Sequence, residues 1–180
     1  EKTGFPTPSG KVELYSSILK DLDYDPMPYY EEPPESPLRL PEVAKEYPLI
    51  LNTGGNYRPM YHSEFMQLGI GARERHPDPL MDIHPDTARE LGIGDGDWAW
   101  IETLRGRIKQ KARYNDGILP GVVNCQASWW FPEKPANEPE LSGVWESNAN
   151  VLTLDAPEFC DELSGGWCNR ALLCKVYKVE

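Results

Sequence analysis

The chain lacks the features that mark membrane and nucleic-acid-binding proteins. No apolar run approaches the roughly 20 residues that a membrane-spanning helix needs, and residues 1–6 have no signal-peptide core. Lys and Arg number 18 against 29 Asp and Glu, so the formal net charge is -11, and the basic residues form no cluster. The lack of a long apolar run excludes membrane insertion. The lack of a basic patch excludes binding to nucleic acid or to an anionic membrane surface, because both of these partners are negatively charged.

The few histidines and cysteines also follow no metal-site or hydrolase pattern. His76 and His84 lie beside no Ser or Cys at a nucleophile elbow, which excludes a hydrolytic triad. The turn acids Asp95 and Asp97 miss the spacing of a calcium loop. Buried free thiols are the favoured interpretation of the cysteines, which form no C-x-x-C pair and have no His at zinc-finger spacing: Cys125, Cys160, Cys168 and Cys174.

Length and composition predict one globular domain preceded by an arm. The 180 residues are 39% hydrophobic and include 18 Pro and 15 Gly, which favours a turn-rich, mainly β protein. Residues 1–46 are rich in proline and acid, and we interpret them as an extended N-terminal arm or linker. The compact domain is predicted to span residues 47–180.

Short periodic segments in this domain predict several strands and one clear helix. Residues 84–92 carry Pro at the first helical position and Gly just past the end, so a two-turn helix is expected with His84 near its cap. Residues 98–103 and 107–114 alternate as paired strands, and residues 122–125 and 171–179 form further strands. Many short strands with few short helices predict a closed β-barrel.

The most informative local feature is the buried strand that ends in Leu51-Asn52-Thr53-Gly54-Gly55. Paired glycines let main-chain N–H groups approach an anionic ligand closely. Donors follow at Arg58, His62 and Ser63, and we favour a ligand contact for His62 over a structural hydrogen bond. By contrast, Gly92-Ile93-Gly94-Asp95-Gly96 follows a helix instead of opening one, which excludes a Rossmann fingerprint.

Aromatic and amide side chains in residues 129–153 leave two interpretations open. Trp129, Trp130 and Trp145 could stack on a flat ring, although each taken singly is better explained as a cover for the barrel end. Asn148 and Asn150 offer a donor and an acceptor together, which suits the edge of a pterin or guanine ring. Asn is also common in turns.

Seven short motifs follow one another along the chain: Thr-Pro-Ser-Gly-Lys-Val-Glu-Leu-Tyr-Ser (7–16), Leu-Asn-Thr-Gly-Gly (51–55), Tyr-His-Ser-Glu (61–64), Ile-His-Pro-Asp-Thr-Ala with Leu-Gly-Ile-Gly-Asp-Gly-Asp (83–97), Arg-Gly-Arg-Ile (105–108), Pro-Gly-Val-Val (120–123) and Asn-Val-Leu-Thr (150–153). In order and spacing the chain resembles the C-terminal dinucleotide-binding domain of molybdopterin oxidoreductases of the dimethyl sulfoxide reductase family. Its Trp-Trp-Phe-Pro and Trp-Glu-Ser-Asn segments are most similar to the thiosulfate/polysulfide reductase and acetylene hydratase branch.

The resemblance implies a double-psi β-barrel that binds molybdopterin guanine dinucleotide, two copies of which (bis-MGD) chelate molybdenum or tungsten in the complete enzymes. It implies that this domain covers and orients the cofactor without a catalytic residue or metal ligand of its own. Eight positions match the family's cofactor contacts: Thr53, Gly54, Gly55, His62, Ser63, Glu64, Asn150 and Arg170. Four neighbouring residues are carried over with them: Asn56, Arg58, Tyr61 and Asn148.

The chain departs from the complete enzymes in what it does not contain. Their metal-binding Cys, selenocysteine, Ser or Asp and their cysteine-rich iron–sulfur segment belong to earlier domains. We therefore expect an excised fragment or a separately encoded subunit, whose partners are the remaining domains or a catalytic subunit, and no catalysis by the isolated chain. A soluble protein is expected, and both the cytoplasm and the periplasm remain open.

One alternative function comes from a different class. Six Trp and nine Tyr would also suit a stand-alone aromatic-lined β module that binds a carbohydrate or other small ligand. The two hypotheses differ in the ligand, since His62→Ala should abolish dinucleotide binding and Trp130→Ala should abolish sugar binding. A self-processing decarboxylase on the same barrel type needs a Gly-Ser pair, which the sequence lacks.

Overall fold

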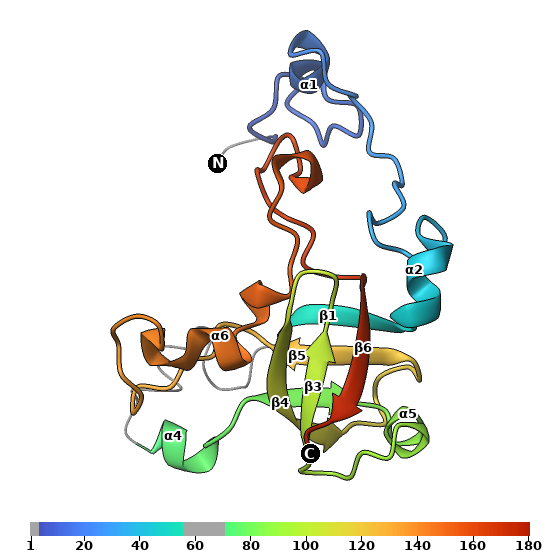
Figure 1. The fold of residues 1–180 in the computed structure, drawn as a ribbon. Coiled ribbons are helices and arrows are strands. Elements are labelled where there is room, and N and C mark those ends of the chain that lie inside the picture. The colour runs from blue at the N-terminus through green and yellow to red at the C-terminus, as the bar shows by residue number, and fades with distance from the viewer. Residues whose placement is uncertain (1–3, 56–70) are drawn as a thin grey trace. The chain divides into compact units, whose positions relative to one another are not determined.

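The computed structural model describes residues 4–55 and 71–180 (Figure 1). The chain divides into two compact units, Glu1–Glu32 and Pro33–Glu180. The predicted division between residues 46 and 47 stays a prediction. The elements are α1 Ser17–Asp21, α2 Pro41–Glu46, β1 Leu49–Gly55, α4 Ala72–Arg75, β2 Leu80–Ile83, α5 Pro85–Glu90, β3 Trp98–Glu102, β4 Arg107–Tyr114, β5 Val122–Gln126, η1 Leu141–Gly143, α6 Val144–Ser147, η2 Ala149–Val151, η3 Pro157–Phe159 and β6 Leu172–Lys178.

In the first unit, α1 is the only helix or strand among the described residues 4–32. The Ser16 Oγ caps this helix by accepting a hydrogen bond from the Leu19 N–H at 3.2 Å. None of the described residues 4–32 is buried, and apolar side chains such as Leu14, Ile18 and Leu22 are exposed. The described part of this unit therefore forms no hydrophobic core of its own.

The second unit is a closed six-stranded barrel with the strand order β1-β5-β2-β4-β3-β6. The neighbours β1/β5 and β2/β4 are parallel, and the other four pairs are antiparallel. The expected mainly β fold, a double-psi barrel with few short helices, is confirmed. Among the described helices, none is long and apolar enough to cross a bilayer.

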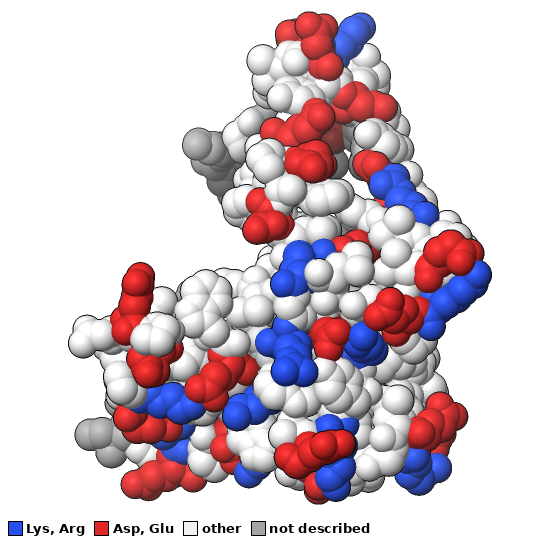
Figure 2. All heavy atoms as spheres, viewed as in Figure 1, with Lys and Arg blue, Asp and Glu red and all other residues white. Residues whose placement is uncertain are grey.

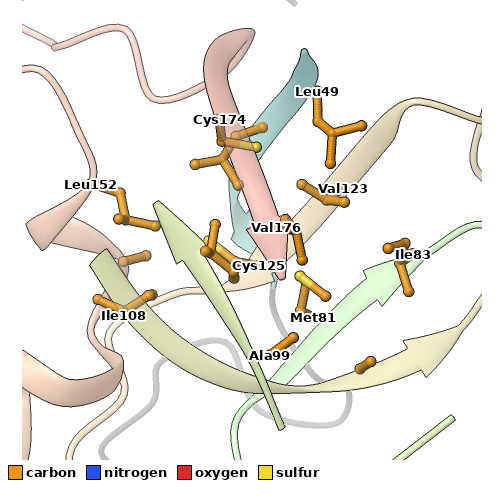
Figure 3. Packing of buried hydrophobic residues seen from close by; sticks show 14 of the residues in the cluster. Leu49, Met81, Ile83, Ala99, Ile108, Val123, Cys125, Leu152, Cys174 and Val176 are labelled. Atoms are coloured by element: carbon orange, nitrogen blue, oxygen red, sulfur yellow. The ribbon is translucent and has the colours of Figure 1, made fainter. Parts of the chain in front are cut away.

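Alternation along the strands produces the barrel core. In β3 the side chains of Ala99 and Ile101 are fully buried, while the alternate residues of the strand are partly exposed, as the sequence predicts. Figure 3 shows aliphatic and sulfur-containing side chains from all six strands converging on the barrel interior. Every strand therefore contributes apolar surface to the core, and this burial is the main stabilising contribution to the fold.

The predicted two-turn helix is α5. Its N-cap, His84, accepts a hydrogen bond from the Asp86 N–H at Nδ1 over 3.1 Å, and Pro85 is the first helical residue. Gly92, with φ of +68°, follows the helix. The cap assignment of His84 is therefore confirmed.

Residues 33–46 differ from the expected extended chain. Helix α2 begins at Pro41, a position where the missing N–H costs nothing. The Arg105 guanidinium binds both carboxylate oxygens of Glu35, and Lys175 Nζ lies 3.0 Å from Glu46 Oε1. These ion pairs attach the segment to the barrel.

Candidate functional site

The carboxyl ends of the parallel strands β1 and β5 form the base of the candidate site. Asn52 pairs with Asn124, and the next pair joins Gly55 to Gln126. Strand β1 has one more residue than β5 between these pairs, so a bulge bends its end. The Ala127 N–H donates to the Gly55 carbonyl at 3.1 Å and closes the ladder.

The two glycines in this bulge are required for different reasons. Gly54 has a φ of +92°, a backbone conformation that side-chain-bearing residues rarely adopt. A Cβ on Gly55 would lie 2.9 Å from Asn124 Nδ2 and 3.0 Å from the Cys125 carbonyl oxygen. The turn therefore depends on conformation at one glycine and on space at the other.

A pocket of about 280 Å³ opens at this strand end. Pockets that enclose a whole small ligand have volumes of about 300–1,000 Å³. This pocket is therefore the size for one part of a larger ligand, such as a phosphate group or one ring. Its lining residues among the described ones are Asn52, Thr53, Gly54, Gly55, Asn124 and Arg170.

The segment that leads into β6 is hydrogen-bonded to β1 beside the pocket. The Thr53 N–H and Oγ1–H both donate to the Asn169 carbonyl oxygen, at 3.0 and 2.7 Å. The Ala171 N–H donates to Asn52 Oδ1 at 3.2 Å. Arg170 lies between the two bonded residues and is the one charged residue of the described lining. It gives the pocket a positive charge in a chain whose net charge is -11.

A buried glutamine holds the end of β5 in place. Gln110 is fully buried on β4, and its Nε2 donates to the carbonyl oxygens of Gln126 and Ser147 at 3.0 and 3.1 Å. Its Oε1 accepts from the Gln126 N–H at 3.0 Å. The Gln110 side chain on β4 is thus hydrogen-bonded to backbone groups of the last residue of β5 and of helix α6.

Elsewhere on the barrel, acidic and basic side chains are paired. The Tyr177 hydroxyl donates to Glu102 at 2.6 Å and, with Lys175, lowers the pKa of that carboxyl. Glu46, and then Glu102, raise the pKa of Lys175. Figure 2 shows side chains of both signs interleaved on the face it displays. These charges neutralise one another locally, whereas Arg170 lines a pocket whose other described lining residues are uncharged.

The family model described as "Molydopterin dinucleotide binding domain" matches residues 49–167, which include the bulge, strands β1 to β5 and α6. The chain belongs to this molybdopterin dinucleotide-binding domain family. The predicted family is therefore confirmed.

Similar proteins agree with this assignment. Acetylene hydratase from Syntrophotalea acetylenica is 41% identical over 99% of this chain. A dimethyl sulfoxide/trimethylamine N-oxide reductase from Rhodobacter capsulatus is 28% identical over 96% of it. The solved acetylene hydratase from Pelobacter acetylenicus superposes with a TM-score of 0.87 at 39% identity over 99% of this chain and 25% of its own. The chain spans 24% and 20% of the length of the two sequence relatives.

The structure of this dinucleotide-binding domain brings four of the predicted site residues together. Thr53, Gly54, Gly55 and Arg170 line one pocket, although Arg170 is more than 110 residues from the others in sequence. Six other predicted contacts lie outside the described residues: Asn56, Arg58, Tyr61, His62, Ser63 and Glu64.

The two predicted amides of residues 148–150 do not line this pocket. Asn148 Oδ1 accepts from the Asn150 N–H at 3.0 Å, and its Nδ2 donates to the Trp129 carbonyl oxygen at 3.2 Å. Asn148 thus caps η2 and ties it to the preceding loop. Asn150 is exposed, and its carbonyl accepts from Thr153 Oγ1. A ligand role for either residue stays a prediction.

Two pocket residues were not predicted as contacts. Asn52 and Asn124 face each other across the β1/β5 pair, which joins positions 72 residues apart. Asn52 falls inside the strand motif. The face of the sheet on which its side chain lies can be assigned only when the position of the bulge in β1 is known. No local signal distinguishes Asn124, because its role depends on strand register.

The aromatic residues divide between core and surface. Trp129 is fully buried, its ring lies at a T-shaped angle to Phe131, and the Arg73 guanidinium carbon lies 4.9 Å from the Trp129 ring centroid. Trp145 is 60% exposed. Burial favours the structural interpretation for Trp129, while a stacking role for the exposed Trp145 stays a prediction.

All four cysteines are free, but only two are buried. Burial raises the pKa of Cys125 to about 12 and also raises that of Cys174. Cys160 and Cys168 are partly exposed, so the prediction of buried thiols is wrong for this pair. Both belong to residues 155–169, which extend from the barrel as a hairpin with the bridge Cys160–Trp167 (Figure 1).

Proposed function

We propose that this chain binds molybdopterin guanine dinucleotide through the pocket at the ends of β1 and β5, and that it orients the cofactor for a molybdenum or tungsten centre held elsewhere. The main-chain N–H groups of the glycine bulge face the negatively charged part of the ligand. Arg170 adds a cation, and amide side chains meet a ring edge.

The observation that carries this proposal is the joint occurrence of the glycine bulge and Arg170 in one pocket. A Cβ at Gly55 would fill the space beside Asn124, so the backbone at this point is open only because the residue is glycine. Glycine turns that expose N–H groups form concave sites for phosphate. The residues present therefore fit one end of a dinucleotide.

The cofactor, when bound, supplies the redox or Lewis-acid chemistry of its metal. The chain's own contribution is to hold the ligand, fix its orientation and offset its charge. The polar segment from Asn56 to Glu64, with Arg58, Tyr61, His62 and Ser63, is proposed to supply further contacts beside the pterin and the phosphates.

We propose that the chain acts as the C-terminal part of a larger enzyme of the acetylene hydratase-like branch, either as its last domain or as a separate subunit. The relatives are four to five times longer, as their covered shares of 24% and 20% require. Among residues 4–55 and 71–180, no three His, Cys, Asp or Glu side chains are grouped to hold a metal ion. The exposed apolar side chains of residues 4–32 support contact with the remaining domains.

The carbohydrate-binding alternative is set aside. The family match covers the glycine bulge and strands β1 to β5, and among the candidate stacking residues Trp129 is fully buried. Relatives that share this domain are named for different reactions, the hydration of acetylene and the reduction of dimethyl sulfoxide.

The proposal is tested by the cofactor content of the complete enzyme that carries this chain. Pterin and guanine nucleotide are released with acid and quantified per polypeptide for the parent, for Arg170→Gln and for the control Arg89→Gln. Arg89 is also exposed and lies on α5, paired with Asp86 outside the pocket. We expect Arg170→Gln to lower the content and Arg89→Gln to leave it unchanged. Equal content in all three proteins, or an absence of guanine nucleotide in the parent, contradicts the proposal.

A further inference from the structure

Two of the pocket residues use their polar atoms within the chain. The Thr53 hydroxyl donates to the Asn169 carbonyl oxygen at 2.7 Å, and Asn52 Oδ1 accepts from the Ala171 N–H at 3.2 Å. Thr53 is only 6% exposed. A ligand could take the Thr53 proton only by breaking a partly buried hydrogen bond, which makes this hydroxyl a poor direct donor.

These bonds hold a segment that does not adopt its conformation freely. Ala171 has a φ of +58°, a left-handed backbone conformation that is unfavourable for a residue with a side chain. Such conformations persist where surrounding contacts fix them. The bonds from Thr53 and Asn52 flank Arg170 on both sides, and the Cys168 thiol donates to the Arg170 carbonyl oxygen at 3.1 Å. The backbone at Arg170 is therefore held against β1.

Unlike Asn52, the Asn124 side chain makes no hydrogen bond to another of the described residues. Its Nδ2 lies 2.9 Å from the position that a Gly55 Cβ would take, so its amide occupies the space directly over the glycine bulge. The side chain is partly exposed and lines the pocket. An amide at this place offers a donor and an acceptor to a ligand seated on the bulge.

We infer a division of roles that deepens the proposed function and rests on it: Asn52 and Thr53 position Arg170, whereas Arg170 and Asn124 contact the ligand. Arg170 binds the diphosphate of a dinucleotide, and Asn124 binds an adjoining polar edge. Thr53, although matched to the family's cofactor turn, acts on the ligand through the segment 169–171.

The test measures how fast the complete enzyme releases its pterin dinucleotide at low and high KCl, by the fluorescence of the oxidised pterin. Arg170→Gln should release the ligand roughly tenfold faster and lose most of the salt dependence, since a charge-assisted bond is removed. Thr53→Val has the same shape without the hydroxyl, and it should accelerate release several-fold with a weakened salt dependence. Thr53→Ser keeps the hydroxyl and should match the parent.

The double variant Thr53→Val/Arg170→Gln decides the assignment of roles. If Thr53 acts through Arg170, the double variant releases ligand no faster than Arg170→Gln alone. The inference is overturned if the increases in release rate caused by the two substitutions multiply in the double variant. It is also overturned if Thr53→Val releases the ligand at the parental rate while Arg170→Gln does not. Unfolding midpoints are measured for each protein, and Asn52→Ala, which removes the acceptor for Ala171, replaces Thr53→Val if that variant does not fold.

Failure of the proposed function gives a different result. Asn124→Asp places a negative charge beside the diphosphate and should accelerate release. If both Asn124→Asp and Arg170→Gln keep the parental release rate and salt dependence, the pocket does not hold the ligand at all. In that case the division of roles falls with the proposed function.

Discussion

At the scale of single residues, Gly55 is under the tightest steric restriction at the site. An alanine Cβ would lie 2.9 Å from Asn124 Nδ2 and 3.0 Å from a backbone carbonyl oxygen, and the carbonyl belongs to the β5 ladder. We expect Gly55→Ala to lower the free energy of unfolding by about 1–3 kcal/mol. We also expect it to reduce the pterin content, because either Asn124 or the bulge must shift.

The matched control is Gly166→Ala in the exposed hairpin, where the nearest atom is Ser164 Oγ at 3.3 Å. Chemical denaturation and pterin content together check the prediction. A Gly55→Ala protein with the stability and pterin content of Gly166→Ala would show that the space over Gly55 has no role.

At the scale of elements, Gln110 links three backbone segments. Gln110→Met keeps the volume but leaves the Gln126 N–H and the carbonyl oxygens of Gln126 and Ser147 without their partner. Each buried unpaired group costs about 1–3 kcal/mol, so we expect a loss of about 3 kcal/mol or more. Faster hydrogen exchange at the Gln126 amide should accompany it.

The neighbouring Lys109→Met serves as the control, since Lys109 points outward and its ion pair with Glu146 is partly solvated. Its effect should stay below about 1 kcal/mol. Equal losses in the two variants would mean that the buried hydrogen bonds do not hold the end of β5.

The pairing of strands β3 and β6 contributes to the stability of the fold in a pH-dependent way. Bonding by Tyr177, and then by Lys175, holds the pKa of Glu102 below its ordinary value of 4.5. The ionised carboxylate therefore stabilises the fold above pH 4.5, and this contribution is lost as the pH falls through the lowered value. We expect Glu102→Gln to cost about 1 kcal/mol at neutral pH.

The difference between Glu102→Gln and the parent should shrink on acidification below pH 4.5, as measured by urea denaturation across that range. Glu42→Gln removes an exposed partner of Lys45 and should give no such trend. If the difference in the free energy of unfolding between Glu102→Gln and the parent stays constant with pH, the assignment of the pH-dependent stability to Glu102 is contradicted.

Elements with a complete local signal could be predicted from the sequence. Pro85 and Gly92 delimit α5, and alternation over residues 98–103 and 107–114 delimits β3 and β4. Strand β2 was missed because its Leu-Met-Asp-Ile segment is short and largely buried, with no alternation. Helix α2 was missed because it follows several prolines and begins with one.

At the scale of the whole molecule, the site depends on contacts that no local pattern contains. Thr53, Gly54 and Gly55 could be predicted from the glycine turn and the family resemblance. Asn124 could not, because its place opposite Asn52 follows from the closed barrel and the β1/β5 register. Closure of the barrel therefore places the Asn124 amide and the Arg170 guanidinium beside the glycine motif at the end of β1.

In this proposal the glycine bulge and Arg170 together bind one side of a pterin dinucleotide. The most direct measurement is a structure of the cofactor-loaded complete enzyme that carries this chain. We expect ligand oxygen atoms within hydrogen-bond distance of the Arg170 guanidinium and of the Gly54 or Gly55 N–H. A bound cofactor that leaves this pocket filled with solvent alone would contradict it.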